Sequence, residues 1–320
     1  MGVGALTPAL KGQPDMPLHI ETPLIPSSPL SRDGLDVWLK LEALQPPGSF
    51  KIRGIGHACE RHAQAGKRRF VSSSGGNAGL AVAYAGRRLG LPVTVVVPET
   101  TSARARALIE AEGAELRVHG AAWHEANALA LSLVDETTAF LHPFDDPLLW
   151  EGHASLIDEA IGQGARFDAV VLSVGGGGLL SGVVEGLRRN GLDTPVFAAE
   201  TRGAASLARS IEAGHRVELA EIATVATSLA ARQVCERAFE LTRSHDIRPV
   251  LVSDRQALQA CERFLDDHRV LVEPACGAAL AALDVADLSA FRSVLVVVCG
   301  GAVATIDTIR AANAALGKAD

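Results

Sequence analysis

The chain has 320 residues, of which 48% are hydrophobic and only 4% aromatic, so it can bury a large core built mainly from Ala, Val, Leu and Ile. Its formal net charge is −7, and no run of lysine or arginine offers the basic surface that nucleic acid or an anionic membrane would require. The longest apolar run, Val294–Cys299, is too short to span a bilayer.

Short apolar runs alternate along the chain with amphipathic segments rich in Ala, Leu and Arg, which is the rhythm of βαβ units. The predicted strands are Val37–Leu41, Arg69–Ser72, Val93–Val97, Glu115–Val118, Ala169–Val174, Val196–Ala199 and Val294–Cys299. The predicted helices are Ile52–Gln64, Ala78–Leu89, Ala103–Glu112, Trp123–Val134, Leu179–Arg189, Arg255–Asp267 and Ala304–Leu316. This order predicts a doubly wound α/β protein with mostly parallel sheets.

The segment His142–Ser155 is rich in Pro and Asp and separates two βαβ series, so we predict that it is the crossover between two lobes. The expected small domain spans residues 45–145, and the expected large domain combines residues 1–44 with 146–320. Residues 1–16 lack the pattern of a signal peptide and are expected to form a flexible arm. The five scattered cysteines, without a CxxC pair, favour a reduced cytoplasmic protein.

Lys51 stands between Phe50 and Ile52 in the stretch GSFKIRG, directly after a Pro-Pro-Gly turn. Ser49 can cap a helix that begins near Lys51, which would place the amine at the positive end of that helix. Desolvation and the helix dipole both lower the pKa of a lysine, and a neutral amine can act as a nucleophile or a base. Lys51 is therefore a candidate catalytic residue. A surface lysine that keeps its ammonium in water is the alternative interpretation.

Two glycine-rich segments each follow a predicted strand and precede a predicted helix. The first, SSSGGNAG (Ser72–Gly79), offers backbone N–H groups, hydroxyls and the Asn77 amide to a carboxylate or a phosphate. On its own it is also compatible with an ordinary turn. The second, SVGGGGLLSG (Ser173–Gly182), contains four consecutive glycines, whose cost in chain entropy is hard to justify in a plain turn. We interpret it as a nest of N–H groups around a phosphate.

A third strand followed by glycines, VVVCGGA (Val296–Ala302), places Cys299 at the carboxyl end of a strand, where open α/β sheets bind ligands. The alternative is that Cys299 is a small buried hydrophobe, as most free cysteines are. The sequence contains no P-loop motif, no GxSxG elbow and no HExxH or Cys/His cluster for zinc.

The strand, glycine loop, helix and strand that end at Glu200 also imitate a nicotinamide-binding unit, because Glu200 stands about where that unit places its ribose-binding acid. The spacing does not match GxGxxG, since Leu180 and Ser181 occupy the positions where a third glycine would be required. A nicotinamide-dependent oxidoreductase would also leave Lys51 without a role.

In this order, the segments GSFKIRG, SSSGGNAG, SVGGGGLLSG and VCGG resemble the fold-type II enzymes that depend on pyridoxal 5′-phosphate (PLP), whose fold is that of the tryptophan synthase β chain. The resemblance is strongest to the short catabolic L-serine dehydratases, or L-serine ammonia-lyases, which also act on L-threonine. Three further segments are similar to that group, namely Leu18–Ser27, Pro143–Ser155 and Val272–Ala282. The resemblance implies a two-lobed fold whose large domain binds PLP, a small amino-acid substrate and a homodimer.

The resemblance also assigns roles to individual residues. Lys51 would hold PLP as a Schiff base and later remove the Cα proton of the substrate, Asn77 would contact the 3′-oxygen of the cofactor ring, and Cys299 would face the ring nitrogen. The substrate carboxylate would bind Ser74, Gly75 and Asn77. The cofactor phosphate would bind Gly175, Gly176, Gly177 and Gly178. A monovalent cation, for which K⁺ is the candidate, would bind Glu200, Ala204, Ser206 and Leu229.

The expected reaction is β-elimination, which converts L-serine to pyruvate and ammonia, and L-threonine to 2-oxobutanoate and ammonia. A thiol at the ring nitrogen stabilises a pyridinium less than a carboxylate does, which favours prompt elimination. β-Replacement of the cysteine synthase type and serine racemisation are alternatives within the fold. The related replacement enzymes usually have Ser or Thr in place of Cys299, and the racemases have serine in place of Gly75. A ligand-binding protein without catalysis is a further alternative, which a desolvated Lys51 opposes.

Gly75 departs from the family pattern, because the active short dehydratases usually have alanine at this place. We expect the missing methyl group to slow turnover and to leave room for the extra methyl group of threonine. Gly75→Ala is therefore expected to raise the turnover of serine. Because the chain ends soon after the helix predicted over Ala304–Leu316, we expect no C-terminal regulatory domain.

Overall fold

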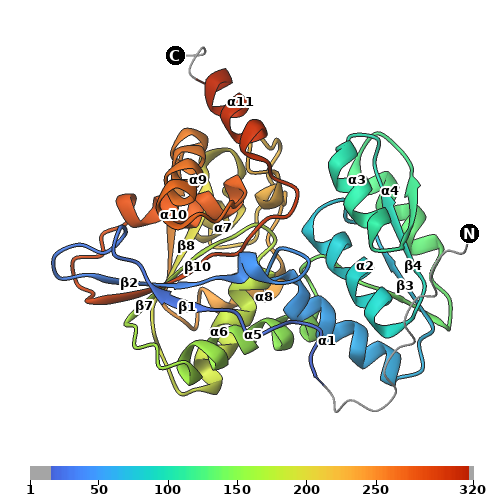
Figure 1. The fold of residues 1–320 in the computed structure, drawn as a ribbon, viewed down its shortest axis with the longest axis horizontal. Coiled ribbons are helices and arrows are strands. Elements are labelled where there is room, and N and C mark those ends of the chain that lie inside the picture. The colour runs from blue at the N-terminus through green and yellow to red at the C-terminus, as the bar shows by residue number, and fades with distance from the viewer. Residues whose placement is uncertain (1–15, 317–320) are drawn as a thin grey trace, which may run out of the picture.

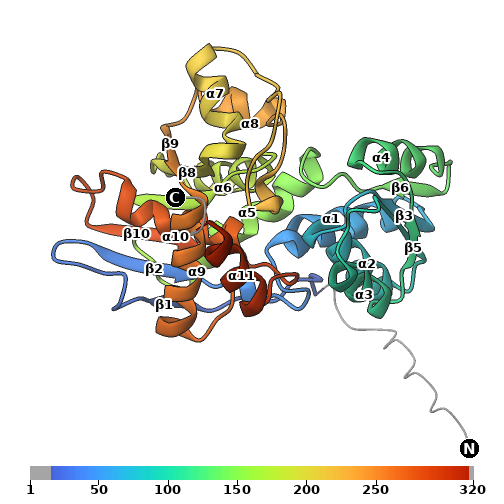
Figure 2. The ribbon, with the colours of Figure 1, turned by 90° about the horizontal axis from the view of Figure 1, so that it is seen from above.

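The computed structural model describes residues 16–316, which form two α/β lobes lying side by side (Figure 1). The expected N-terminal arm, residues 1–16, lies outside the described residues except for Met16, which is exposed. Helix α1 (Lys51–Gln64) packs against helices of both lobes and so lies at their junction (Figure 2).

The larger lobe holds a six-stranded sheet in the order β1-β2-β10-β7-β8-β9. All neighbouring strands are parallel except β1, which runs antiparallel to β2. The strands are β1 Leu24–Pro26, β2 Asp36–Lys40, β7 Ala169–Ser173, β8 Val196–Thr201, β9 Ile247–Val252 and β10 Ser293–Val297. Strands β7 and β8 are buried along their whole length, as expected of parallel strands that helices cover on both faces.

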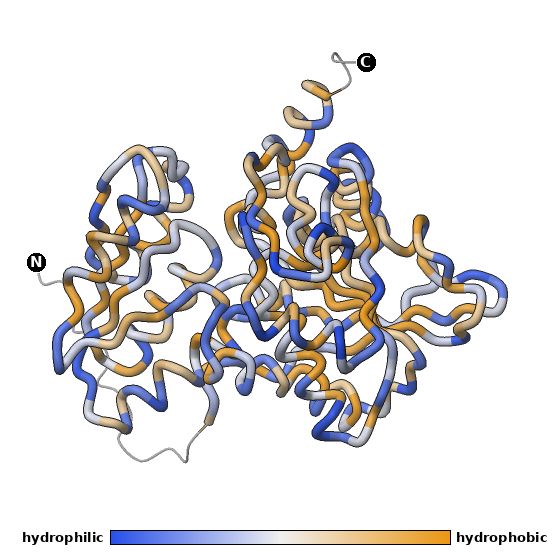
Figure 3. The backbone as a smooth tube through the Cα atoms, turned by 180° about the vertical axis from the view of Figure 1, so that it is seen from behind, coloured by the Kyte–Doolittle hydropathy of each residue, from blue (hydrophilic) through white to orange (hydrophobic). Residues whose placement is uncertain are grey.

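Helices α5 and α6 pack together on one side of this sheet, and α9 and α10 pack together on the other side (Figure 1). The helices of the larger lobe are α5 Pro147–Gly162, α6 Gly178–Arg189, α7 Ser206–Ala213, α8 Glu236–Leu241, α9 Asp254–His268, α10 Pro274–Val285 and α11 Ile306–Leu316. Its short 3₁₀ helices are η1 Glu42–Leu44, η2 Arg202–Ala204 and η3 Thr227–Leu229. Figure 3 shows that apolar residues follow the central strands, so the core lies between the sheet and these helices.

The smaller lobe holds a fully parallel sheet in the order β5-β4-β3-β6. Its strands are β3 Arg69–Ser72, β4 Val93–Val97, β5 Glu115–Val118 and β6 Thr138–Phe140, and its helices are α2 Asn77–Leu89, α3 Ala103–Ala111 and α4 Trp123–Ser132. Successive residues of a strand face opposite sides of the sheet. Phe70 and Val95 accordingly join the core formed with α1 and α2, whereas Val71 and Val96 pack against α4.

The structure confirms the predicted two-lobed, mostly parallel α/β fold. The predicted crossover segment His142–Ser155 follows β6 of the smaller lobe and runs into α5, which packs on α6 of the larger lobe, and its second half is helical because α5 begins at Pro147. Asp146 caps this helix by accepting a hydrogen bond from Leu148 N (2.8 Å), and proline suits the first helical position. The prediction missed β1, β6, α5, α7, α8, β9 and α10. Within residues 16–316, no helix combines the length and the apolar character needed to cross a membrane.

Candidate functional site

Lys51 is the first residue of α1, and the loop before it is bonded to the loop that follows β10. Phe50 N donates to the carbonyl of Cys299 (3.1 Å), and Gly301 N donates to the carbonyl of Gly48 (2.9 Å). Gly48 has φ +78°, and a Cβ there would lie 2.8 Å from the side chain of the neighbouring loop, so this position requires glycine. The backbone therefore holds the Lys51 and Cys299 segments together.

The predicted role of Ser49 as a helix cap was wrong. The N-cap residue of α1 is Phe50, which makes no side-chain cap, and the buried Ser49 hydroxyl has no hydrogen-bond partner in the part of the chain that the structure describes. Ser49 instead forms an isolated β-bridge with Gly300, which directs the loop toward β10 rather than along α1.

The amine of Lys51 lies in a setting that favours its neutral form. Its Nζ donates to the carbonyl of Pro143 (2.6 Å) and lies 5.1 Å from the centre of the Phe50 ring. Desolvation lowers the pKa of Lys51 to about 8, while the nearby Cys299 and Glu273 oppose this shift. A substantial neutral fraction at slightly alkaline pH makes this amine able to act as a nucleophile or a base.

The four glycines predicted to bind a phosphate lie between β7 and α6, in a space that admits no side chain. A Cβ at Gly176 would overlap the ring of Phe144, and one at Gly178 would lie 2.7 Å from the carbonyl of Phe144. Gly177 has φ +93°, and a Cβ at Gly175 would lie 2.9 Å from the carbonyl of Ser228. Among the described residues, the backbone N–H groups of these glycines have no acceptor, so they can bind an anion at the N-terminus of α6.

Residues 143 and 144 connect this glycine loop to the catalytic candidate. The carbonyl of Pro143 accepts the hydrogen bond from Lys51, and the next residue, Phe144, packs on Gly176 and Gly178. The lysine amine and the glycine loop therefore contact two adjacent residues of one segment, although 124 positions separate Lys51 from Gly175.

The loop that precedes α2 brings the predicted carboxylate-binding residues to the same junction. Ser74 Oγ accepts a weak hydrogen bond from Gly76 N (3.4 Å), and Gly75 lies beside it. The amide of Asn77 crosses to the larger lobe, where Oδ1 accepts from Ala302 N (3.2 Å) and Nδ2 donates to Glu273 Oε1 (2.9 Å). One proton of the Asn77 amide is thus already engaged with protein.

Cys299 follows β10 and lies beside the end of β7, the neighbouring strand. Its Sγ is 3.6 Å from Ser173 Oγ. A hydrogen bond with Cys276 and burial both raise the pKa of Cys299 well above its ordinary value. The group that would face the cofactor ring nitrogen is therefore a neutral thiol.

Of the four residues predicted to bind a cation, Glu200, Ala204 and Ser206 lie at the start of α7, and Leu229 ends η3. The buried carboxylate of Glu200 accepts from Leu207 N and Ala208 N, both at 2.8 Å, and burial raises its pKa to about 7. Ser206 contributes a buried hydroxyl that has no hydrogen-bond partner among the described residues, and Leu229 lies beside Gly175. Ala204 ends η2. In the part of the chain that the structure describes, no cluster of three or more His, Cys, Asp or Glu residues could hold a metal ion.

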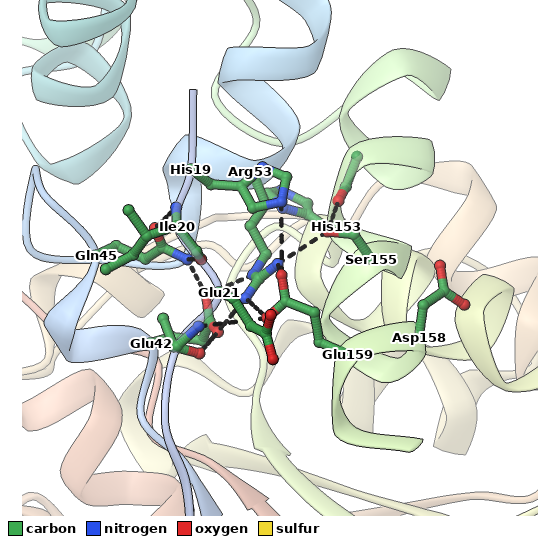
Figure 4. A network of polar contacts seen from close by, with 12 residues as sticks. His19, Ile20, Glu21, Glu42, Gln45, Arg53, His153, Ser155, Asp158 and Glu159 are labelled. Atoms are coloured by element: carbon green, nitrogen blue, oxygen red, sulfur yellow. Dashed lines mark hydrogen bonds and ion pairs between the residues drawn. The ribbon is translucent and has the colours of Figure 1, made fainter. Parts of the chain in front are cut away.

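Sequence reasoning missed a buried ionic network directly behind Lys51, which Figure 4 shows. Arg53, two residues along α1, donates through Nε and Nη2 to Glu42 (2.7 and 2.8 Å). Its Nη1 and Nη2 donate to Glu159 of α5 (2.7 and 2.6 Å), and Nη1 also reaches Ser155 (3.0 Å). The first turn of α1 is thereby fixed to η1 and α5.

Lys40 completes the charge balance of this network. Its Nζ donates to Glu159 Oε2 (2.8 Å), to Gln163 Oε1 (2.9 Å) and to the carbonyl of Thr22 (2.8 Å). Lys40 and Arg53 face the two carboxylates of Glu42 and Glu159, so two positive charges meet two negative ones. This pairing offsets the large cost of burying each ion.

Comparison with known proteins identifies the family. Residues 16–300 match the family described as "Pyridoxal-phosphate dependent enzyme", and the chain belongs to that family. The chain is 49% identical over 299 residues to "Serine dehydratase-like" of Mus musculus, an overlap that covers 89% of this chain and 91% of the relative. It is 45% identical over 316 residues to human "L-serine dehydratase/L-threonine deaminase", covering 94% and 96% of the two chains.

A solved structure agrees with this assignment. The crystal structure of a fungal L-serine ammonia-lyase from Rhizomucor miehei superposes with a TM-score of 0.85 at 34% identity, covering 92% of this chain and 99% of that chain. The alternative of a nicotinamide-dependent oxidoreductase is overturned by the family match, and the carboxylate of Glu200 is instead occupied by two N–H groups of α7.

Proposed function

We propose that this chain is an L-serine and L-threonine ammonia-lyase that uses PLP. L-Serine would give pyruvate and ammonia, and L-threonine would give 2-oxobutanoate and ammonia. The observation that carries the proposal is the convergence of a desolvated lysine amine and a glycine-only cradle of N–H groups at one junction, linked through Pro143 and Phe144. The relatives at 45–49% identity bear names for this type of reaction.

The residues present fit the cofactor. A phosphate would occupy the N–H groups of Gly175–Gly178 that lack acceptors, and Lys51 would bind the cofactor covalently. The second proton of Asn77 Nδ2 would serve the ring 3′-oxygen, and Cys299 would face the ring nitrogen with a neutral thiol. When bound, PLP supplies the sink for the electrons released at the substrate Cα.

Side chains and backbone groups of this chain would bind the substrate and move its proton. The loop of Ser74, Gly75 and Asn77 would orient the substrate carboxylate at the N-terminus of α2. Lys51 Nζ would take the Cα proton, which its lowered pKa of about 8 permits near neutral pH. The carbonyl of Pro143 would hold the freed amine in place.

A monovalent cation, with K⁺ as the candidate, is proposed at Glu200, Ala204, Ser206 and Leu229. Support comes from the unpartnered hydroxyl of Ser206 and the buried carboxylate of Glu200. Because Leu229 adjoins Gly175, a cation there would brace the loop that binds the phosphate.

We also propose that the protein works in the cytoplasm as a homodimer. The described cysteines are all free and buried, which suits a reducing compartment. The dimer rests on the family resemblance, and light scattering coupled to size-exclusion chromatography tests it. A mass near twice the 33.4 kDa chain is expected, and 33.4 kDa would contradict it.

The test is pyruvate release from L-serine by the purified protein with added PLP, beside Lys51→Ala. We expect pyruvate from the parent and a rate lower by about 10³-fold or more in the variant, because the base is lost. Parallel assays with L-threonine, with an added thiol and for D-serine distinguish elimination from β-replacement and racemisation. A parent that binds PLP yet releases neither oxo acid would contradict the proposal.

A further inference from the structure

Glu273 is a buried carboxylate at the site to which the reaction proposed above gives no task. It immediately precedes α10 in the larger lobe, and its backbone N–H reaches the carbonyl of Gly300 (3.4 Å). Its side chain lies over Gly301, where any Cβ would overlap it. Glu273 therefore borders the same loop as Cys299, although the sequence reasoning noted it only as part of a family-like segment.

The contacts of Asn77 determine how its amide is oriented. Its Oδ1 accepts from Ala302 N, which can only donate, and its Nδ2 therefore lies on the other side, where it donates to Glu273 Oε1. In a flipped amide, Nδ2 would face the donor Ala302 N, and Oδ1 would face the accepting oxygen of Glu273. The second proton of Nδ2 has no acceptor among residues 16–316 and is free to serve a ligand.

Glu273 is itself fixed from the other side. The hydroxyl of Ser228 lies close enough to favour its ionised form, and the carbonyl of Ser228 adjoins Gly175 of the glycine loop. Burial raises the pKa of Glu273, whereas the Ser228 hydroxyl, the hydrogen bond from Asn77 and the charge of Lys51 favour the ionised form. The carboxylate thus joins α2 of the smaller lobe to two segments of the larger lobe.

We propose that Glu273 is a positioning residue, which accepts one proton of the Asn77 amide so that the other points at the ring 3′-oxygen of bound PLP. The proposal deepens the function proposed above and rests on it. An acceptor is what this role requires, and a negative charge is not essential to it.

The first test compares Glu273→Gln with Glu273→Ala in PLP-loaded protein. Glutamine keeps an oxygen that can accept from Asn77, while its amide nitrogen can donate to Ser228 Oγ. We expect Glu273→Gln to retain the absorbance spectrum of the bound cofactor and the pH midpoint of that spectrum. Glu273→Ala should shift both and weaken PLP binding by about tenfold, the worth of one hydrogen bond. The same loss in both variants would overturn the proposal.

A matched control addresses general destabilisation. Thr201→Val removes a partly buried hydrogen bond to Thr224 in the larger lobe, and neither threonine is hydrogen-bonded to Asn77 or Glu273. We expect this variant to lower the melting temperature without moving the cofactor spectrum. A spectrum that follows the melting temperature in Thr201→Val and Glu273→Ala alike would overturn the positioning role.

The second test exchanges the two polar groups. In Asn77→Asp, two carboxylates would face each other, which should destabilise the protein and alter the spectrum. In Asn77→Asp/Glu273→Gln, the glutamine amide donates to the new carboxylate, so the hydrogen bond returns with reversed polarity, but no N–H remains for the cofactor. We expect the melting temperature to recover and the spectrum to stay altered. Recovery of both would overturn the proposal, since the pair would then be only structural.

These outcomes are separate from the fate of the proposed function. If the parent binds PLP and releases pyruvate but Glu273→Ala behaves as the parent does, only the positioning role is overturned. If the parent does not bind PLP, the proposed function is overturned and the positioning role with it.

Discussion

Lys51 and Arg53 are two basic residues on the same turn of α1, and their surroundings shift their pKa values in opposite directions. Arg53 is completely buried and paired with two carboxylates, which raise its pKa. Among residues 16–316, Lys51 has only the carbonyl of Pro143 within hydrogen-bond reach, and desolvation lowers its pKa. The difference teaches that burial alone does not make a cation reactive. Lys51 is desolvated and has no ion pair with any described residue, so it can act as a base. Arg53 is neutralised by its carboxylates and anchors the helix that carries Lys51.

The largest expected effect on stability comes from removing Arg53 from the buried ionic network. Arg53→Met leaves Glu42 without its cation and Glu159 with Lys40 alone, and we expect it to lower the free energy of unfolding by about 3–5 kcal/mol. Urea denaturation measures this. The free energy of unfolding of Arg53→Lys should lie between those of the parent and Arg53→Met. Lysine keeps the positive charge but lacks the planar guanidinium that binds two carboxylates at once.

The matched control for Arg53→Met is Arg87→Met. Arg87 pairs with Glu112 at the surface and is half exposed, so its loss should cost no more than about 1 kcal/mol. Equal losses in the two variants would mean that the buried network does not anchor α1.

In protein without cofactor, replacing Lys51 should raise the free energy of unfolding, whereas replacing Arg53 lowers it. Because the folded pKa of about 8 lies below the ordinary 10.5, burying the charged amine costs about 3 kcal/mol at pH 7. That cost disappears as pH rises from about 8 to 10.5. Lys51→Met should therefore be more stable than the parent at pH 7, with a gap that closes by about pH 10.5. A pH-independent gap would contradict the desolvated amine.

Replacing Gly75 should have a smaller effect. The structure also limits the condition under which Gly75→Ala is expected to raise serine turnover. A Cβ at Gly75 would lie 2.6 Å from Thr101 Oγ1 and 2.7 Å from Thr101 Cγ2. Overpacking of this kind costs about 1–3 kcal/mol. We expect Gly75→Ala to raise serine turnover only when Thr101→Ala makes room for the methyl group. Steady-state kinetics of the two single variants and the double variant measure this, and an equal effect of Gly75→Ala in both backgrounds would refute it.

The smallest effect concerns Glu200. Its folded pKa of about 7 lies above the ordinary 4.5, so without a cation the folded state loses stability as pH rises from about 4.5 through 7. K⁺ bound to the ionised carboxylate should offset this loss by about 1 kcal/mol when K⁺ is several-fold above its dissociation constant. Melting temperatures in potassium and tetramethylammonium chloride should diverge more at pH 8 than at pH 6. An undiminished difference in Glu200→Gln would exclude this site.

Local patterns predicted what depends on neighbours in the sequence. Strands β4 and β7 are apolar except for Thr94 and Ser173, and the glycine loops directly follow strands, so both features could be predicted from the sequence. Strands β1 and β6 are only three residues long, too short for a period to register, and β9 contains a proline. The start of α5 did carry a signal, since Asp146 followed by proline is typical of a helix N-terminus.

Features that depend on distant partners could not be predicted in this way. Ser49 does not cap α1, because the loop pairs with Gly300, 251 positions away. The hydrogen bond between Asn77 and Glu273 joins residues 196 positions apart, and Arg53 meets Glu159 across 106. Only the folded arrangement brings these side chains together.

The most direct test of the central claim is to identify which lysine carries PLP. The chain has five lysines, at positions 11, 40, 51, 67 and 318. Borohydride reduction of PLP-loaded protein, followed by peptide mass mapping, makes the lysine–cofactor bond permanent and locates it. We expect one label per chain, at Lys51, and none at Lys40, whose amine is held by Glu159. A label at another lysine, or labels spread over several, would contradict the assignment of Lys51 as the desolvated and reactive cation of α1.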